Sequence, residues 1–301
     1  EPQPSEWVHL RPGQLLFTYL HLAPDPEQAK GLIASGCTAI AYETVTDDRG
    51  ALPLRAPMSE VAGRLAIEAA GQAMRRSEGG AGILLGGVPG VAAGRVTVLG
   101  GGVVGTHAAR MAVGLGAEVT IVDRSIPRLR QLDEMFNGRV RTRYSTLEAI
   151  EHEISLADAV IGAVLIPGAS APRLVTRKML KHMKPGSVLV DVAIDQGGCF
   201  ETSEVTNHTN PVFRKYGVIH YCVPNIASRV ARTASCALSN IFTPILMSIG
   251  EEGGMDEFLW SNKTVRSGIY LYKGTVTNKF VSDYCKLPYR DLNLLMASRI
   301  Y

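Results

Sequence analysis

Residues 96–125 read VTVLGGGVVGTHAARMAVGLGAEVTIVDRS and contain the pattern Gly-x-Gly-x-x-Gly at Gly100, Gly102 and Gly105. The pattern alone is a weak signal, because short glycine runs also form turns that bind nothing. Here it directly follows the β-branched run 95–100, and residues 106–115 have apolar side chains at helical spacing. A strand, a glycine turn and a helix in that order are the context in which the pattern binds a dinucleotide, so the sequence favours such a site over a bare turn.

Each glycine of the pattern has a distinct predicted role. Gly100 permits the tight turn, Gly102 lets the backbone approach a pyrophosphate, and Gly105 allows the helix to pack closely on the strand. The first turn of the helix offers unpaired N–H groups and the positive end of the helix dipole to the phosphates.

The acidic residue that such a site needs is found at the end of the next predicted strand. Asp123 closes the run 117–123, where a carboxylate hydrogen-bonds the ribose 2′-hydroxyl. That carboxylate would repel a 2′-phosphate, so NAD is expected in preference to NADP. Arg124 follows immediately, and its positive charge weakens this preference for NAD.

The chain from Arg95 onward alternates short β-branched runs with helical patterns, which indicates right-handed βαβ units and a parallel sheet. Six such runs fit a doubly wound α/β (Rossmann) sheet. A second, smaller α/β set precedes them, in which runs 15–22 and 37–43 flank the helical stretch 24–36. The six predicted strands lie within residues 95–100, 117–123, 139–145, 158–165, 187–193 and 217–223.

Two long helices are predicted at about 59–76 and 226–249, and both have apolar positions on more than one face. Helices that are buried on several sides suit the connection between two domains. After Glu251 the pattern becomes irregular, with a weak helix near the C-terminus, and this tail is expected to return to the smaller domain.

Composition excludes several classes of protein. Hydrophobic residues make up 46% and charged residues 20%, which is ordinary for a folded globular protein. The net charge is +3 and the basic residues are scattered, so no nucleic-acid partner is expected. The most apolar region, 82–105, is interrupted by Arg95, Pro89 and many glycines, so we expect no membrane span and no membrane partner.

Cysteine and histidine spacing indicates neither a metal site nor a disulfide framework. The five cysteines are odd in number and contain no Cys-x-x-Cys pair, which fits a reduced cytoplasm. His220 and Cys222 lie on a predicted strand and are interpreted as core residues. The remaining histidines apart from His21 have no metal-ligand spacing: His9, His107, His152, His182 and His208.

Several ungapped motifs, in the same order along the chain, resemble the alanine dehydrogenases. The resemblance implies NAD-dependent, reversible oxidative deamination of L-alanine to pyruvate and ammonia by a homohexamer. The NAD-binding subunit of proton-translocating transhydrogenase and the saccharopine dehydrogenases are similar in fold and remain the alternatives. The motifs are TYLHLA (18–23), GVPGV (87–91), GGGVVG (100–105), DVAIDQGG (191–198) and HYCVPNI (220–226).

The same resemblance implies a domain division and a set of site residues. A catalytic domain would begin with 1–57, an NAD-binding domain would span 58–226, and 227–301 would form an interdomain helix and return to the catalytic domain. His21 is implied as the catalytic acid/base and Asp195 as the second catalytic residue. Cofactor contacts are implied for Ser59, Val103, Val104, Asp123, Arg128, Ser145, Val164, Leu165, Val192, Ala193, Ile194, Asp195, Val223, Pro224, Asn225 and Ile226, besides the three glycines.

From the residues alone, each of these polar side chains has a second interpretation. His21 ends an apolar run, where an imidazole could exchange protons in the cleft between the lobes or be a buried structural histidine. Asp195 closes the apolar run SVLVDVAI, but an aspartate before QGG also suits a cap or turn, and Asp191 is a rival in the same run. Asn225 follows Pro224 and would either bind substrate through its amide or form a turn.

One part of the family pattern lies before Glu1. The resemblance implies an Arg and a Lys for the substrate carboxylate and carbonyl in that preceding segment. We therefore expect residues 1–301 alone to bind NADH but to oxidise almost no alanine, because charge-assisted carboxylate contacts supply both affinity and orientation.

Overall fold

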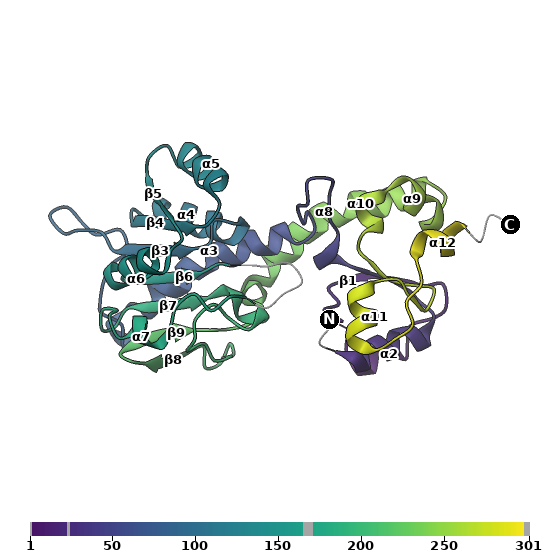
Figure 1. Cartoon of the computed structure of the whole chain (residues 1–301), viewed down its shortest axis with the longest axis horizontal. Coiled ribbons are helices and arrows are strands. Elements are labelled where there is room, and N and C mark those ends of the chain that lie inside the picture. Colours follow the sequence, from purple (N-terminus) through teal and green to yellow (C-terminus); the bar gives the residue numbers. More distant parts are fainter. Residues whose placement is uncertain (1, 23–24, 165–170, 298–301) are drawn as a thin grey trace. The chain divides into compact units, whose positions relative to one another are not determined.

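The computed structural model describes residues 2–22, 25–164 and 171–297. The chain forms two compact units (Figure 1). The first unit contains 1–57 and 236–301, and the second contains 58–235. The chain passes from one unit to the other inside α3 (Ala56–Ala73) and inside α8 (Ala231–Glu251).

The second unit is built on a seven-stranded sheet, and all six predicted strands are confirmed. Its strand order is β5-β4-β3-β6-β7-β9-β8. Every neighbouring pair is parallel except β8 with β9. The edge strand β8 was not predicted. The strands are β3 (Arg95–Leu99), β4 (Glu118–Asp123), β5 (Val140–Tyr144), β6 (Ala159–Gly162), β7 (Val188–Asp191), β8 (Val212–Lys215) and β9 (Val218–Tyr221).

Helices cover both faces of this sheet, as the doubly wound interpretation requires. Val96 and Val98 of β3 pack in one apolar cluster with α3, α4 (Val103–Gly114) and α5 (Ile126–Phe136). Leu99 of β3 and Leu189 of β7 pack in a second cluster with α6 (Leu147–Leu156) and α7 (Arg177–Leu180). The central strands are apolar on both sides because both faces are covered, which is typical of parallel sheets.

The first unit has a four-stranded sheet of order β1-β2-β10-β11. β1 (Leu15–Thr18) and β2 (Thr38–Ala41) are parallel and are connected through α2 (Pro26–Ser35), as predicted. The C-terminal tail belongs to this unit and adds two strands that the sequence did not indicate, β10 (Ile269–Tyr272) and β11 (Thr275–Val276). The short helices of this unit are α1 (Pro4–Trp7), α9 (Met255–Ser261), α10 (Lys263–Arg266), α11 (Lys279–Cys285) and α12 (Leu292–Ala297).

The two long helices differ in burial. In α3 only Arg64, Glu68 and Gln72 are exposed, and their spacing of four residues leaves the other sides covered. The expectation that the second long helix is buried on several sides is wrong, because Ala234 and Phe242 are the only buried residues of α8. Apolar periodicity cannot distinguish a helix face that packs within its own chain from one that is left exposed.

The exposed helix also bears on the expected absence of a membrane span. The continuous helical segment Ile226–Glu251 is the one stretch of the described residues that is long and apolar enough to cross a bilayer, and an 18-residue window within it has a mean hydropathy of 1.3. Length and composition are weak evidence for a single helix, because helices of soluble proteins pass the same test. Pro244 lies inside α8.

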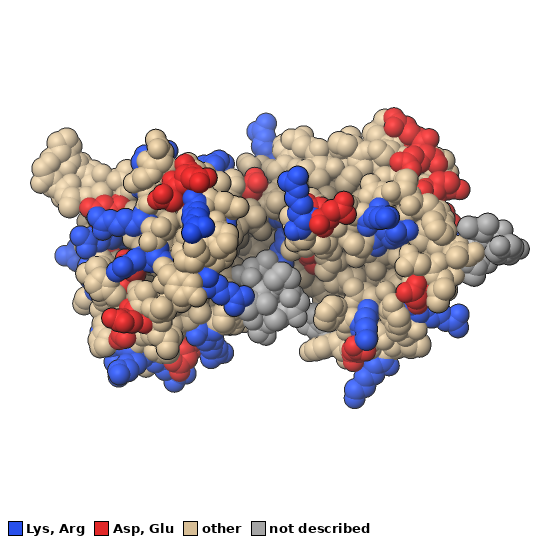
Figure 2. Space-filling view, turned by 45° about the horizontal axis from the view of Figure 1, so that its top comes forward, with Lys and Arg blue, Asp and Glu red and all other residues tan. Residues whose placement is uncertain are grey.

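Charged side chains are mixed on the face of the molecule shown in Figure 2. Lys and Arg alternate there with Asp and Glu, and the described residues on that face form no continuous basic area. This distribution agrees with the scattered basic residues in the sequence.

Candidate functional site

Most of the residues predicted to contact the cofactor lie at one edge of the sheet of the second unit. The carboxyl ends of its six parallel strands meet at this edge, where ligands of doubly wound folds bind. The strand order reverses between β3 and β6, which makes this the topological switch point. Leu165 lies outside the described residues. Asp123 is the last residue of β4, and the segments that follow the strands contain Gly100, Gly102, Ser145, Val164, Val192 to Asp195 and Val223 to Ile226.

The glycine loop is packed tightly at two of the three glycines of the Gly-x-Gly-x-x-Gly pattern. A Cβ added to Gly100, whose φ is +100°, would lie 2.7 Å from the carbonyl oxygen of Ala163. A Cβ on Gly105 would lie 1.8 Å from the carbonyl oxygen of Gly100. These two positions therefore need glycine for the fold itself.

Gly102 has a different environment. A Cβ there would meet nothing within 4 Å, and the residue is exposed. Gly102 is the N-cap of α4, and no side chain caps that helix end. Open space beside uncapped N–H groups is what a pyrophosphate requires, so this loop fits a dinucleotide.

We expect Gly102→Ala to weaken NADH binding at least about tenfold with little change in thermal stability, because the added methyl group would fill the open space at the helix end. Gly114→Ala is the matched control, since a Cβ at Gly114, near the other end of α4, also meets nothing within 4 Å. Calorimetric titration with NADH and thermal unfolding would measure both quantities. Unchanged NADH affinity in Gly102→Ala would contradict the assignment.

Asp123 is tied to the glycine loop. Its Oδ2 accepts from the N–H of Gly101 at 2.7 Å, and its Oδ1 accepts from the N–H of Ser125 at 2.8 Å. A carboxylate has about four acceptor sites, so further sites remain for ribose hydroxyls. Arg128 holds the same loop by donating to the carbonyl of Gly101 and to Thr106 Oγ1, each at 2.7 Å.

Ser59 belongs to the first turns of α3. One helical turn later, a Cβ on Gly63 would lie 2.3 Å from the carbonyl oxygen of Val104, which shows how closely α3 packs against the start of α4. Residues four apart share one face of a helix, so Ser59 lies on the side of α3 that faces α4.

The structure brings Asp195 and Asn225 together. Asp195 Oδ1 accepts from the N–H of Asn225 at 3.2 Å, and both side chains are exposed. They follow β7 and β9, which are neighbours in the sheet. Asn225 has φ of +48° and so does form a turn, and its side chain makes no cap hydrogen bond to the 3₁₀ turn that follows.

The expected position of Asp195 at the end of a strand is wrong. β7 ends at Asp191, and Asp195 lies in the 3₁₀ turn η3 (Val192–Gln196) that follows. Asp191 is buried and acts as the N-cap of this turn. The sequence does not show where β7 ends, because Val192, Ala193 and Ile194 continue the strand-like composition into the turn.

His21 belongs to the first unit and is exposed, so it is not a buried core histidine. β1 ends at Thr18, three residues before it, and not at His21 as expected. The backbone of His21 has φ of +45°, and the ring of Tyr19 stacks parallel to the imidazole with 6.0 Å between ring centroids. The segment is held by Glu43, whose Oε1 accepts from the N–H of His21 at 2.7 Å and from the N–H of Leu20 at 3.2 Å.

Glu43 is a residue that the sequence interpretation missed. It is 7% exposed and follows β2, the parallel neighbour of β1. A carboxylate at the end of the apolar run CTAIAYE was the available signal. Its partners are backbone N–H groups more than twenty residues earlier in the chain, and a sequence motif does not indicate such contacts.

His220 is a core residue, as predicted. Its Nδ1 lies 3.1 Å from the carbonyl oxygen of Val218, and its Nε2 lies 2.8 Å from Thr202 Oγ1. Burial lowers the pKa of His220 to about 4, so the ring is neutral at physiological pH. Cys222 is also buried, which raises the pKa of its thiol to about 12. The described residues contain no group of three or more His, Cys, Asp or Glu that could hold a metal ion.

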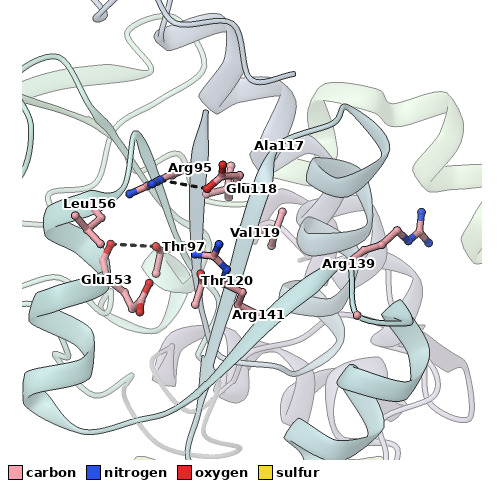
Figure 3. Close-up of a pocket in the computed structure, with 12 residues that line it drawn as sticks. Arg95, Thr97, Ala117, Glu118, Val119, Thr120, Arg139, Arg141, Glu153 and Leu156 are labelled. Carbon is pink, nitrogen blue, oxygen red and sulfur yellow. Dashed lines mark hydrogen bonds and ion pairs between the residues drawn. The ribbon is translucent and has the colours of Figure 1, made fainter. Parts of the chain in front are cut away.

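A cavity of about 280 Å³ lies near the amino ends of β3 and β4, away from the edge described above (Figure 3). Two of its polar side chains bond to other lining residues: Arg95 Nε lies 3.2 Å from Glu118 Oε2, and Thr97 donates to the carbonyl of Glu153 at 3.3 Å. Ligands of doubly wound sheets bind at the carboxyl ends of strands, so this cavity is not the dinucleotide site.

Comparisons with known proteins cover nearly the whole chain. Alanine dehydrogenase from Halomonas elongata is 53% identical over 297 residues, which are 99% of this chain and 80% of that protein. The Bacillus subtilis alanine dehydrogenase is 52% identical over 94% of this chain and 74% of its own length. A solved L-alanine dehydrogenase superposes with a TM-score of 0.90 at 45% identity, covering 94% of this chain and 78% of its own. The solved transhydrogenase from Sinorhizobium meliloti superposes with a TM-score of 0.78 at 25% identity, covering 92% of this chain and 79% of its own.

The domain families agree with these relatives. The N-terminal domain of the alanine dehydrogenase/PNT family matches residues 1–62, and its C-terminal domain matches residues 66–279. The motif TYLHLA (18–23) lies within the N-terminal match, and the other four motifs lie within the C-terminal match. The chain therefore belongs to the alanine dehydrogenase/PNT family.

Proposed function

We propose that this protein is an NAD-dependent alanine dehydrogenase, which converts L-alanine to pyruvate and ammonia and runs in reverse as an amination. The observation that carries the proposal is the 53% identity to an alanine dehydrogenase over 99% of the chain. The open glycine loop and the carboxylate of Asp123 support a dinucleotide cofactor in the second unit.

The proposed cofactor contacts follow from the edge of the sheet. Gly102, the uncapped start of α4 and the N–H groups of Val103 and Val104 would hold the pyrophosphate. Asp123 would bind the ribose hydroxyls, with Arg128 fixing the loop beside it. Further contacts are proposed for Ser59, Ser145, Val164, the turn 192–195 and residues 223–226. When bound, NAD supplies the acceptor for the hydride that leaves the α-carbon of alanine.

His21 is the proposed acid/base. Its imidazole would take a proton from the substrate amine or the attacking water and return it in the reverse direction. Glu43 supports this role by accepting from the backbone N–H groups of Leu20 and His21, which fixes the segment that carries the imidazole. Stacking on Tyr19 restricts the ring further.

Asp195 is the proposed second catalytic residue. Its hydrogen bond from the N–H of Asn225 orients one carboxylate oxygen, while the side chain stays exposed. The side-chain amide of Asn225 is proposed to donate to the substrate carbonyl or to the nicotinamide carboxamide. An ionised Asp195 can accept a proton or hold a positively charged intermediate, and either use requires a fixed position.

Assembly and location are also proposed from the family. We infer a homohexamer in the cytoplasm. The exposed apolar side chains of α8, including Leu246 at 51% and Met247 at 59% exposure, support association with another copy of the chain. Light scattering of the purified protein would measure the mass of the assembly.

A second candidate is a dinucleotide-binding subunit of the transhydrogenase type. The likeness to the transhydrogenase from Sinorhizobium meliloti, at 25% identity, favours it as the alternative. That candidate needs a dinucleotide site and a partner, but no alanine chemistry. It predicts NADH binding without alanine-dependent reduction of NAD.

We expect the full-length protein to reduce NAD in the presence of L-alanine and to form an equal amount of pyruvate, with NADP at least about tenfold poorer because Asp123 repels a 2′-phosphate. The measurement is NADH absorbance together with a pyruvate assay, with each cofactor in turn. Equal use of NADP would overturn the role of Asp123. An absence of alanine-dependent reduction with either cofactor would overturn the proposed function and favour the binding subunit.

A further inference from the structure

We propose that Asp191 is a positioning residue, whose buried carboxylate holds the turn that carries Asp195. The inference rests on the proposed function for the catalytic importance of Asp195, but the contacts of Asp191 do not depend on that assignment. Asp191 belongs to no predicted set of site residues.

The carboxylate of Asp191 bonds to both ends of the segment 193–199, which contains most of the turn η3. It lies at the end of β7 and is 1% exposed. Oδ1 accepts from the N–H of Ala193 at 3.1 Å, inside the turn η3, and Oδ2 accepts from the N–H of Cys199 at 3.0 Å, three residues after the turn ends at Gln196. Asp195 lies between these two attachment points.

Side chains complete the set of donors. Ser203 Oγ donates a short hydrogen bond to Oδ2, and the thiol of Cys199 lies 3.6 Å from Oδ1. Burial raises the pKa of the Cys199 thiol well above its ordinary value, so the thiol stays protonated and can donate. Four donors around one carboxylate are what a buried charge needs, since an unpaired one is very costly.

The turn is shaped around this carboxylate. Gly198 has φ of +79°, and a Cβ there would lie 2.6 Å from Asp191 Oδ2. Burial raises the pKa of Asp191, whereas the bonds from Ser203, Cys199 and Ala193 lower it. These hydrogen bonds therefore stabilise the buried carboxylate, and they also fix the positions of the groups that donate them.

The consequence for Asp195 is geometric. With the segment 193–199 attached to β7 at both ends, the exposed Asp195 side chain is held where its Oδ1 accepts from the N–H of Asn225 at 3.2 Å. Loss of either attachment would free the turn to move while the strands stay paired. Catalytic groups displaced by about 1 Å lose about two orders of magnitude in rate.

The test is Asp191→Asn, which keeps the volume of the side chain. An amide offers only one oxygen, so its NH₂ group must face one of the two backbone N–H donors and one attachment is lost. The matched control is Asp158→Asn. Asp158 is 6% exposed and accepts from the N–H of Arg95 and from Lys184 Nζ, each at 2.8 Å, at the opposite edge of the same sheet.

Two measurements decide the proposal in the full-length protein. Amide hydrogen exchange of the segment 193–199 should become faster in Asp191→Asn and stay unchanged in Asp158→Asn. For alanine oxidation, Asp191→Asn should lower kcat about 10- to 100-fold with a smaller change in KM. In an Asp195→Asn background the same substitution should change kcat less than about twofold, because Asp191 acts through Asp195.

Equal loss of kcat in Asp158→Asn, or a full multiplicative loss in the Asp195→Asn background, would overturn the proposal, as would unchanged exchange of 193–199. If Asp191→Asn does not fold, Ser203→Ala removes a single donor and should give the same pattern at smaller size. A wild-type protein without alanine oxidation would refute the proposed function, whereas the exchange comparison would still decide whether Asp191 holds the turn.

Discussion

His21→Ala in the full-length protein is expected to lower kcat for alanine oxidation by about two to four orders of magnitude while NADH affinity stays unchanged. Loss of a positioned acid/base typically has an effect of this size. Cofactor binding should survive because the glycine loop and Asp123 belong to the second unit, whereas His21 belongs to the first. Steady-state kinetics and calorimetric titration measure the two quantities.

The matched control for this substitution is His9→Ala, which also removes an exposed imidazole from the first unit. We expect wild-type kinetics from the control. Turnover within a few-fold of wild type in His21→Ala would remove the imidazole from the mechanism and leave Glu43, Leu20 and Tyr19 as contacts of a merely structural loop.

Asp195→Ala is expected to reduce kcat by a similar two to four orders of magnitude, with a modest loss of NADH affinity because the turn 192–195 is also proposed to contact the cofactor. The substitution removes the carboxylate that accepts from the N–H of Asn225. Asp133→Ala, at an exposed position on α5, is the control. The same two assays apply.

The role of Asp195 would be contradicted by two patterns. A kcat near that of wild type would remove its carboxylate from the chemistry. A large loss of NADH affinity at unchanged kcat would make Asp195 a cofactor contact alone.

The sheet of the second unit could be predicted from sequence because its central strands are buried on both faces. Such strands read as unbroken β-branched runs, and the helices between them have their own period. β8 escaped prediction because it is an edge strand with the mixed composition VFRK. β10 escaped because it lies in the irregular stretch after Glu251 and pairs with β2, more than two hundred residues earlier in the chain.

Part of the candidate site could also be predicted from the sequence. The glycine loop and Asp123 are local signals at the ends of strands, and their mutual hydrogen bond follows from two neighbouring parallel strands. The sequence named Asp191 only as a rival of Asp195 and did not indicate Glu43, because both carboxylates accept from backbone N–H groups, which any sequence supplies. Only the folded chain shows that these two carboxylates are buried next to the segments that hold Asp195 and His21.

The central claim is that this protein oxidises alanine at its α-carbon with NAD as acceptor. The most direct test supplies L-alanine carrying deuterium at the α-carbon to the full-length protein with NAD, and analyses the reduced cofactor by mass spectrometry. We predict one deuterium in the reduced cofactor for each pyruvate formed. NADH binding without deuterium transfer would contradict the account and indicate a binding subunit.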